Sequence, residues 1–369
     1  MRVVFDHQCF SIQVYGGISR YFCELALHLQ ENEQVNVAVS APLYINNYLS
    51  NTASIRPCGL KIPHVAYTGL LVRFLNSMIS NLALKHRTDV DIFHETYYMK
   101  LDNSPRSAMR VLTVFDMIHE KFPGAFSSKD KTSRLKALAV NRADHVICIS
   151  ENTRRDLVEL FGVEPQKTSV VYLGHSLQVG GSASQLAQTH RQPFVLYVGK
   201  RGGYKNFSAL VRALGGSRLP AAGFHMVCFG GGPLSTAEIE HMRACQLDPE
   251  LITYCSGTDD ILAGLYQRAA LLVYPSLYEG FGIPPLEAMA LGCPVVCTNT
   301  SSLPEVVGDA AELFDPSCSE QITAALEAVA LSPERASILS RLGRERAQLF
   351  SWKKCAEDTL HVYQRLSEG

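Results

Sequence analysis

The sequence predicts an α/β protein made of two tandem domains, each built on a parallel sheet. Short apolar runs rich in β-branched residues alternate with longer segments of helical period, as in βα units. The alternation stops over residues 174–193, which are rich in Gly, Ser and Gln, and then starts again. The length of 369 residues also favours two domains over one.

In the first half, the expected strands are MRVVFD, VNVAVS, DIFHE, RVLTVFD, HVICIS and SVVYLG. A helix is expected from about residue 17 to residue 30. A longer apolar segment, residues 67–86, is interrupted by Arg73 and Asn76. Its period fits a helix packed on the sheet, and the alternative is a helix that also touches a membrane surface. Basic residues flank it, and a second basic run comprises Lys129, Lys131, Arg134 and Lys136.

In the second half, the expected strands are FVLYVG, GFHMVCFGGG, LITYCSG, ALLVYPS and PVVCTN. NFSALVRAL, ILAGLYQRA and PPLEAMALG have the period of helices between them. The last segment, SWKKCAEDTLHVYQRL, predicts a helix that contains the only tryptophan, Trp352. We therefore expect a first domain over residues 1–178, a second over 179–350 and a final helix over 351–369.

The composition argues against several classes of protein. Hydrophobic residues make up 47% and charged residues 19%, and the net charge of -1 does not fit a nucleic-acid-binding surface. The N-terminus lacks the pattern of a signal peptide, and no apolar stretch is long enough to span a membrane. The eleven cysteines have neither zinc-site spacing nor a disulfide framework, which favours a reducing cytosol.

Two glutamates, Glu279 and Glu287, lie in YEGFGIPPLE, directly after the expected strand ALLVYPS. Ligands of open parallel sheets bind beyond the carboxyl ends of the strands, so this loop lies where a ligand is expected. An ionised carboxylate accepts hydrogen bonds and donates none, which suits sugar hydroxyls. The alternative is that Glu279 is a solvated loop charge and that Glu287, in the first helical turn, only favours the helix dipole.

The same loop has the features of a phosphate-binding turn. Gly280 and Gly282 allow backbone amides to approach a ligand closely. Pro284 and Pro285 are compatible with the first turn of a helix, and Gly292 with its end. Because amides at a helix N-terminus attract phosphate, the loop fits a ligand with both phosphates and hydroxyls.

Two further clusters fit such a ligand. Arg201 and Lys205 follow the expected strand FVLYVG, and cations there can neutralise a diphosphate leaving group. Gly16 and Gly17 open the first helix of the first domain and form a second turn suited to phosphate. The alternatives are a solvated basic turn and a plain glycine turn.

With these motifs the chain resembles the retaining glycosyltransferases of family 4. The E-x7-E pattern of that family is matched within EGFGIPPLEAMALGCPVV, its basic pair within YVGKRGGYKN and its first-loop glycines within YGGISRYF. FGGGP, LYQRAALLVYPSLYEGFG and SSLPEVVGDAAELFDP also look like the family in order and spacing. The resemblance covers essentially the whole chain and is more specific in the second domain.

The resemblance implies a GT-B fold, with two Rossmann-like domains whose parallel sheets face each other across a cleft and a final helix packed back on the first domain. It implies that the second domain binds a nucleotide-sugar, that the first binds the acceptor, and that transfer retains the anomeric configuration without a metal. Glu287 would hold the ribose, Glu279 would contact the donor sugar, and the basic pair would neutralise the diphosphate. The expected catalytic residues are Glu279, Arg201, Lys205, Asp116 and His119; the expected donor-binding residues are Gly16, Gly17, Gly280, Phe281, Gly282, Ile283 and Glu287; the expected acceptor-binding residues are His94 and Tyr97.

The resemblance of YGGISRYF and YPSLYEGFG favours a mannosyltransferase that uses GDP-mannose, with a UDP-sugar as the other donor considered. The implied acceptor is a glycan or a polyprenyl-diphosphate-linked glycan in surface polysaccharide assembly. No cofactor is expected beyond the nucleotide-sugar cosubstrate. We expect a cytoplasmic protein with a peripheral contact on the inner face of the cytoplasmic membrane, and no nucleic-acid partner.

One position departs from the family pattern. Many members carry His-Asp after the TV of a first-domain strand, and that histidine lies near the reacting sugar. Here the run is VLTVFDMIHEKFP, so Phe115 stands at the histidine position and Asp116 remains. His119, four residues on, and His94, in DIFHETYY, are the alternatives for the missing role.

The same residues bear on four other functions. A sugar-nucleotide epimerase of similar fold and a catalytically idle nucleotide-sugar-binding protein remain alternatives. A metal-dependent single-domain transferase needs Asp-x-Asp after a strand, but Asp89 and Asp91 precede one and Asp259 and Asp260 open a helix. A dinucleotide-dependent oxidoreductase needs GxGxxG and an acid about 20 residues later, which FGGGPLS does not provide.

Overall fold

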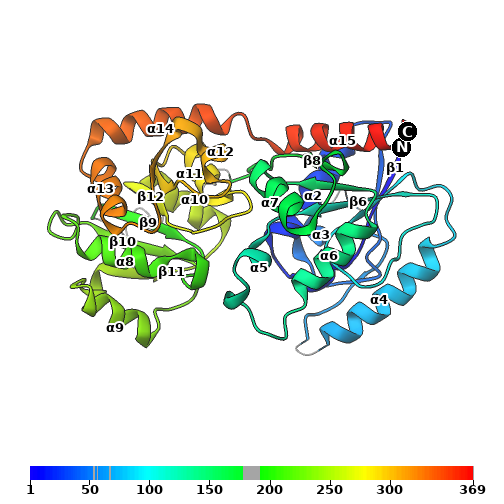
Figure 1. Cartoon of the computed structure of the whole chain (residues 1–369), viewed down its shortest axis with the longest axis horizontal. Coiled ribbons are helices and arrows are strands. Elements are labelled where there is room, and N and C mark those ends of the chain that lie inside the picture. The colour runs from blue at the N-terminus through cyan, green and yellow to red at the C-terminus, as the bar shows by residue number, and fades with distance from the viewer. Residues whose placement is uncertain (53–54, 56, 66–67, 178–191, 369) are drawn as a thin grey trace. The chain divides into compact units, whose positions relative to one another are not determined.

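The computed structural model describes residues 1–52, 55, 57–65, 68–177 and 192–368 and divides into two compact units (Figure 1). Unit 1 comprises Met1–Gly174 and Ser351–Gly369, and unit 2 comprises His175–Phe350. Each unit is built on a six-stranded parallel sheet, so the predicted α/β class with two Rossmann-like domains is confirmed. The expected boundary between residues 178 and 179 falls in the segment 178–191, outside the described residues.

The sheet of unit 1 has the strand order β2-β1-β5-β6-β7-β8, and all its neighbours are parallel. All six strands fall on runs that the sequence predicts. A two-stranded parallel pair, β3–β4, lies outside the sheet and was not predicted. The strands of unit 1 are β1 (Arg2–Phe5), β2 (Asn36–Val39), β3 (Leu43–Tyr44), β4 (Leu60–Lys61), β5 (Ile92–Glu95), β6 (Met109–Val114), β7 (His145–Cys148) and β8 (Thr168–Val170).

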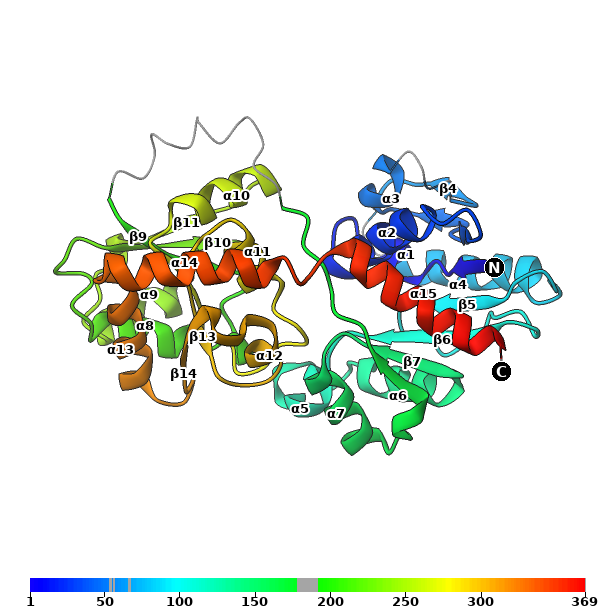
Figure 2. The same cartoon turned by 90° about the horizontal axis from the view of Figure 1, so that it is seen from above.

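The helices of unit 1 are α1 (Gln8–Ile12), α2 (Gly17–Leu29), α3 (Asn47–Asn51), α4 (Gly69–Leu84), α5 (Ile118–Lys121), α6 (Thr132–Arg142), α7 (Glu151–Phe161) and α15 (Trp352–Glu368). Helix α15 packs lengthwise on α2, as Figure 2 shows from above. Its buried residues include Trp352, Cys355, Thr359 and Tyr363, whose spacing places them on one face of the helix. The end of the chain thereby joins the core of unit 1.

The sheet of unit 2 has the order β11-β10-β9-β12-β13-β14, again with parallel neighbours throughout. The chain moves outward in one direction from β9 to β11 and in the other from β12 to β14. The border between β9 and β12 is therefore the topological switch point, where open α/β sheets bind ligands at the carboxyl ends of the strands. These strands are β9 (Phe194–Val198), β10 (His225–Phe229), β11 (Ile252–Cys255), β12 (Leu271–Tyr274), β13 (Val295–Thr298) and β14 (Ala311–Phe314).

Helices cover both faces of this sheet (Figure 1). Right-handed crossovers in opposite directions place α8 and α9 on one face and α10, α11 and α12 on the other. The core between the sheet and the helices on the α8 side includes Tyr197, Leu210 and Leu326, which are all almost completely buried. The helices of unit 2 are α8 (Phe207–Gly215), α9 (Thr236–Ala244), α10 (Asp259–Arg268), α11 (Ile283–Ala290), α12 (Leu303–Val307), α13 (Ser319–Ala330) and α14 (Pro333–Ala347).

Two features of the chain as a whole agree with its composition. All eleven cysteines are free thiols. Within the described residues, no helix combines the length and the apolar content that crossing a bilayer requires.

Candidate active site

The candidate site of unit 2 is built on the two loops that leave the sheet at its switch point. The loop after β9 leads through a short 3-10 turn, Gly203–Lys205, and the loop after β12 contains Glu279. The amide of Leu277 donates to the carbonyl oxygen of Tyr204 at 2.8 Å, so the loops are joined by their backbones. The basic and acidic motifs of the sequence therefore meet at one point of the fold.

Lys205 and Glu279 form an ion pair at this point. The Lys205 ammonium donates to Glu279 Oε1 at 2.5 Å and to the Tyr274 hydroxyl at 3.3 Å. Only 17% of the lysine side chain and 11% of the glutamate side chain are exposed. Burial, with the Glu279 carboxylate adding to it, holds the pKa of Tyr274 well above its usual range, so the phenol stays neutral. The cluster thus places one cation, one anion and one hydroxyl at the switch point.

Hydroxyl side chains at the end of β13 and directly after it hold the glutamate loop in place. Thr298 donates to the carbonyl of Ser276 at 3.0 Å, and Thr300 donates to that of Leu277 at 3.1 Å. Ser302 donates to the carbonyls of residues 279 and 281, at 2.9 and 2.8 Å, and Ser301 accepts from the amide of residue 279 at 3.0 Å. The sequence analysis missed this support, although TNTSS spans the end of the predicted strand PVVCTN and the three residues after it, and so places several hydroxyl side chains there.

Helix α11 begins at Ile283, after Gly280, Phe281 and Gly282 of the loop. Gly282 has φ 122°, and a Cβ there would come within 2.6 Å of a Leu303 methyl carbon, so only glycine fits. Because Pro284 and Pro285 have no N–H, the amides at the helix start belong to Gly282 and Ile283. An anion at this end would meet those two donors and the positive end of the helix dipole.

Glu287 is the fifth residue of α11, so the expectation that it lies in the first helical turn is wrong. Its side chain is buried rather than solvated at the helix end. It lies close to Tyr266, whose pKa is raised above its usual range by burial first and by the Glu287 carboxylate second. The predicted end of the helix is confirmed, because α11 stops at Ala290 and Gly292 has φ 75°.

Arg201 lies at the same edge but is engaged with the next loop. Its guanidinium donates to Glu238 Oε1 at 2.7 Å, to the carbonyl of Pro233 at 2.8 Å and to that of Gly230 at 3.3 Å. Burial alone would raise the pKa of Glu238, but the hydrogen bonds from Arg201 and from Ser235 lower it. Arg201 is therefore paired with Glu238 and with two loop carbonyls, and not with Glu279.

In unit 1, Tyr97, Asp116 and His119 follow β5 and β6 at the carboxyl edge of the sheet. Asp116 accepts from the amide of Ile118, the first residue of α5, at 3.0 Å. Burial, with Asp116 and Asp130 adding to it, raises the pKa of Tyr97 to about 12. The ring of His119 stacks on Phe126, 3.8 Å between centroids, and its Nε2 lies 3.8 Å from Asp130.

His94, expected to bind the acceptor, lies instead in the core of unit 1. The side chain is fully buried, with Nδ1 2.6 Å from the Tyr363 hydroxyl of α15 and Nε2 2.9 Å from Thr113 Oγ1. Burial lowers its pKa to about 3, so the ring is neutral. Phe115 is also turned into this core, with its ring 5.3 Å from that of Tyr21. Both side chains hold unit 1 together.

The expected glycine turn of unit 1 lies at the start of α2, where Gly16 is the N-cap and Gly17 is the first helical residue. A Cβ on Gly16 would come within 2.1 Å of the Gln13 side-chain oxygen, which accepts from the amide of Ser19 at 3.4 Å. A glutamine side chain therefore lies over this helix start, where a phosphate was expected.

Two residues that sequence analysis did not single out lie at the switch point of unit 1, between β1 and β5. Asp6 follows β1 and accepts from the Thr96 amide and hydroxyl, at 3.0 and 2.5 Å, which joins the two strand ends. His7 is completely buried, and neither ring nitrogen has a hydrogen-bond partner among the described residues. Burial lowers its pKa. The pair DH after MRVVF was the signal that could have found them.

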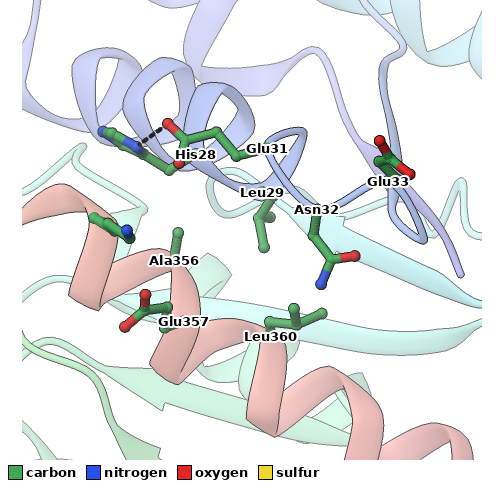
Figure 3. Close-up of a pocket in the computed structure, with 9 residues that line it drawn as sticks. His28, Leu29, Glu31, Asn32, Glu33, Ala356, Glu357 and Leu360 are labelled. Atoms are coloured by element: carbon green, nitrogen blue, oxygen red, sulfur yellow. Dashed lines mark hydrogen bonds and ion pairs between the residues drawn. The ribbon is translucent and has the colours of Figure 1, made fainter.

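A pocket of about 460 Å³ between α2 and α15 does not belong to this chemistry (Figure 3). It is lined by His28 and Leu29 of α2 and by Ala356 and Leu360 of α15, among others. The end of α2 lies beside the start of β2, at the amino edge of the sheet. Since ligands of parallel sheets bind at the opposite edge, size alone does not make this pocket the site.

Known families match both halves of the chain. The model described as Glycosyltransferase Family 4 matches residues 15–179, and that described as Glycosyl transferases group 1 matches residues 182–346. The chain belongs to glycosyltransferase family 4. These two matches leave outside them only short segments at the ends and between the domains.

Relatives of this family 4 chain include mannosyltransferases. It is 44% identical over 108 residues to O-antigen chain mannosyltransferase B of Escherichia coli, a match that covers 29% of this chain and 28% of the relative. It is 40% identical over 121 residues to the MMP alpha-(1->4)-mannosyltransferase of Mycolicibacterium hassiacum, covering 31% and 29%. The chain therefore matches less than a third of the length of these two relatives.

Solved structures of related fold extend over the whole chain. Sucrose-phosphate synthase from Thermosynechococcus elongatus superposes with a TM-score of 0.74 over 99% of both chains, at 20% identity. At that identity the likeness concerns the fold alone. It agrees with the two Rossmann-like domains that the resemblance implies.

Proposed function

We propose that this chain is a retaining glycosyltransferase that moves a hexose, mannose from GDP-mannose, onto a glycan or a polyprenyl-diphosphate-linked glycan in surface polysaccharide assembly. The observation that carries the proposal is the buried Lys205–Glu279 pair at the switch point of unit 2, 2.5 Å apart. The mannosyltransferases among the relatives support the choice of sugar.

The geometry suits a nucleotide-sugar in three ways. The amides at the start of α11 and the Lys205 ammonium can meet a diphosphate, and the cation can stabilise the charge that grows on it as the bond to the sugar breaks. Glu279 can accept hydrogen bonds from the sugar hydroxyls, and Glu287, on the same helix, can accept those of the ribose. We propose that the Lys205 ammonium and the amides at the start of α11 neutralise the diphosphate without a metal.

The test is a panel of nucleotide-sugars, measured for binding and for release of nucleoside diphosphate with and without acceptor. GDP-mannose should be hydrolysed slowly and transferred faster, equally well in excess chelator, and the product should keep the anomeric configuration. Loss of activity in chelator that manganese or magnesium restores contradicts the metal-free mechanism. Binding with no turnover on any acceptor favours an idle binding protein, and an epimerised nucleotide-sugar favours the epimerase.

A further inference from the structure

Helix α4 turns a partly polar side toward the rest of unit 1. Its described buried residues are Val72, Asn76, Ser77, Ser80 and Leu84. Asn76 has no exposed surface, and its amide group donates to Ser11 Oγ and to the carbonyl of Leu43, both at 2.8 Å, while its oxygen accepts from the Leu43 amide at 2.7 Å. Because an unpaired buried amide is costly, these bonds determine which side of the helix faces inward.

The opposite side of α4 is apolar and exposed. Its exposed large residues are Leu71, Phe74, Met78, Ile79 and Leu82. The spacing of Leu71, Phe74, Met78 and Leu82 places them in one stripe along the helix, and 80% of Leu82 is exposed. Figure 1 shows α4 at the periphery of unit 1. Single exposed leucines are ordinary, but five large apolar residues on one short helix form a patch that indicates an interaction surface.

The segment of the chain that contains this stripe carries charges of one sign. No Asp or Glu occurs from Gln34 to Thr88, although the chain as a whole has 35 acidic residues and a net charge of -1. The same segment contains five Lys and Arg residues, of which Arg73 lies in α4 and Lys85 directly follows it, both exposed. A helix with an apolar stripe, a basic residue near each end and no acid of its own complements an anionic lipid surface better than a neutral protein surface.

A pocket of about 420 Å³ opens at the first turn of α4. Its walls include Ile12, Ile45 and Val72, with Arg73 and His64 also lining it. These walls can accommodate part of a lipid chain, while the guanidinium can meet its phosphate. The pocket can therefore hold a single lipid at one end of the stripe, whereas the exposed surface of the helix offers no such cavity.

We propose that α4 lies in the surface of an anionic membrane, with Leu71, Phe74, Met78 and Leu82 in the interface and with Arg73 and Lys85 against lipid phosphates. At 16 residues the helix is suited to lying on the membrane. The purpose of this contact, access to a lipid-linked acceptor, rests on the proposed function, whereas the contact itself needs no donor or acceptor.

One of the four residues in the basic run before and within α6 is not available to a membrane surface. Lys136 is only 1% exposed, and its ammonium binds the Glu120 carboxylate at 2.7 Å and the carbonyl of Asp116 at 2.8 Å. Lys136 therefore stabilises the packing of α6 against α5 within unit 1. The run therefore has three exposed basic residues, Lys129, Lys131 and Arg134, where the sequence has four.

The experiment is vesicle flotation of the full chain, without donor or acceptor, on phosphatidylcholine vesicles with and without phosphatidylglycerol. The wild-type chain should float with the anionic vesicles at low salt. The double variant Phe74→Ser/Leu82→Ser should bind about tenfold less, because two of the most exposed apolar side chains are lost. Arg73→Glu/Lys85→Glu should lose the preference for anionic vesicles. The control, Leu160→Ser, changes an exposed leucine of α7 and should bind like the wild type.

Absence of binding to anionic vesicles at low salt overturns the proposal. So does an equal loss of binding in the Leu160 control, or binding that Phe74→Ser/Leu82→Ser leaves unchanged. A wild-type dimer that this double variant converts to a monomer, without vesicle binding, assigns the stripe to a second copy of the chain. Hydrolysis of nucleotide-sugar should be equal in all variants, so a failed membrane contact can be told apart from a failed assignment of function.

Discussion

Replacement of His94 tests whether this histidine serves the structure of unit 1 or the chemistry. In His94→Leu the ring is replaced by an apolar group of similar size, so packing is largely kept. Thr113 retains a partner, because the Tyr21 hydroxyl lies 3.3 Å from its own. The Tyr363 hydroxyl, however, is fully buried and loses the imidazole 2.6 Å away. Two lost hydrogen bonds of ~1 kcal/mol each and one stranded hydroxyl predict a loss of about 3 kcal/mol in the free energy of unfolding.

The assay is urea unfolding followed by tryptophan fluorescence. Trp352 is the only tryptophan, it is 5% exposed, and it lies on α15 with Tyr363, so its signal reports on unit 1. With a slope of about 2–3 kcal/mol per molar urea, the predicted loss lowers the midpoint by ~1 M. Hydrolysis of nucleotide-sugar at temperatures where the variant is folded should remain near wild type.

The second variant sharpens the test. Adding Tyr363→Phe to His94→Leu removes the stranded hydroxyl, and replacing both members of a buried hydrogen bond by apolar groups is nearly neutral. The double variant should therefore be ~1–2 kcal/mol more stable than His94→Leu alone. Simple addition of the two losses would contradict the structural role. Unchanged stability in His94→Leu with transfer abolished would return His94 to the acceptor site.

Four further outcomes are expected. The pKa of His94 is about 3 in the folded chain and 6.5 ordinarily, so the folded state holds the ring neutral. The free energy of unfolding should therefore fall by up to ~1.4 kcal/mol per pH unit as the pH drops from 6.5 toward 3, and the slope should be smaller in His94→Leu. Lys205→Ala should lower kcat by about a hundredfold with little change in nucleoside diphosphate affinity, whereas Arg201→Ala should lower kcat and also the melting temperature, since its bonds to the loop after β10 are lost. Phe115→His should leave the transfer rate near wild type, and a large increase would show that the family histidine is needed. His7→Asn should slow transfer to the acceptor more than hydrolysis of the donor. If the variant changes both rates by the same factor relative to wild type, His7 belongs to the core and not to the acceptor site.

The order of strands could be predicted in outline because it depends on local signals. Runs such as FVLYVG and PVVCTN are apolar on both faces, as buried parallel strands must be, and they fall on β9 and β13. AELF, which forms β14, was not predicted as a strand, since an edge strand next to the acid-containing run PEVVGDAAE lacks a continuous apolar pattern. The pair β3–β4 has two residues in each strand, too few for any periodicity.

The partners of the site residues could not be predicted, because they come from segments far apart in the chain. Arg201 and Lys205 look equivalent in YVGKRGGYKN, yet one binds Glu238 in α9 and the other binds Glu279 after β12. The same limit applies to His94, whose partner on α15 is 269 positions away. Residue type and spacing indicate which chemistry is present, while the pairing depends on which loops the sheet order brings together.

The pairing of Lys205 with Glu279 explains how charged side chains can be kept at a mostly buried switch point before any ligand arrives. Either charge alone would pay a desolvation cost there, whereas the pair offsets it and Tyr274 offers a further hydroxyl to the ammonium. In the proposed reaction, the diphosphate would replace Glu279 as the partner of Lys205, and the sugar hydroxyls would replace Lys205 as the partners of Glu279. The carbonyls of the loop remain bound by Thr298, Thr300 and Ser302, so its backbone need not move when they do. A site of this kind is organised before the donor binds, which is the condition for charge stabilisation without reorganisation during the reaction.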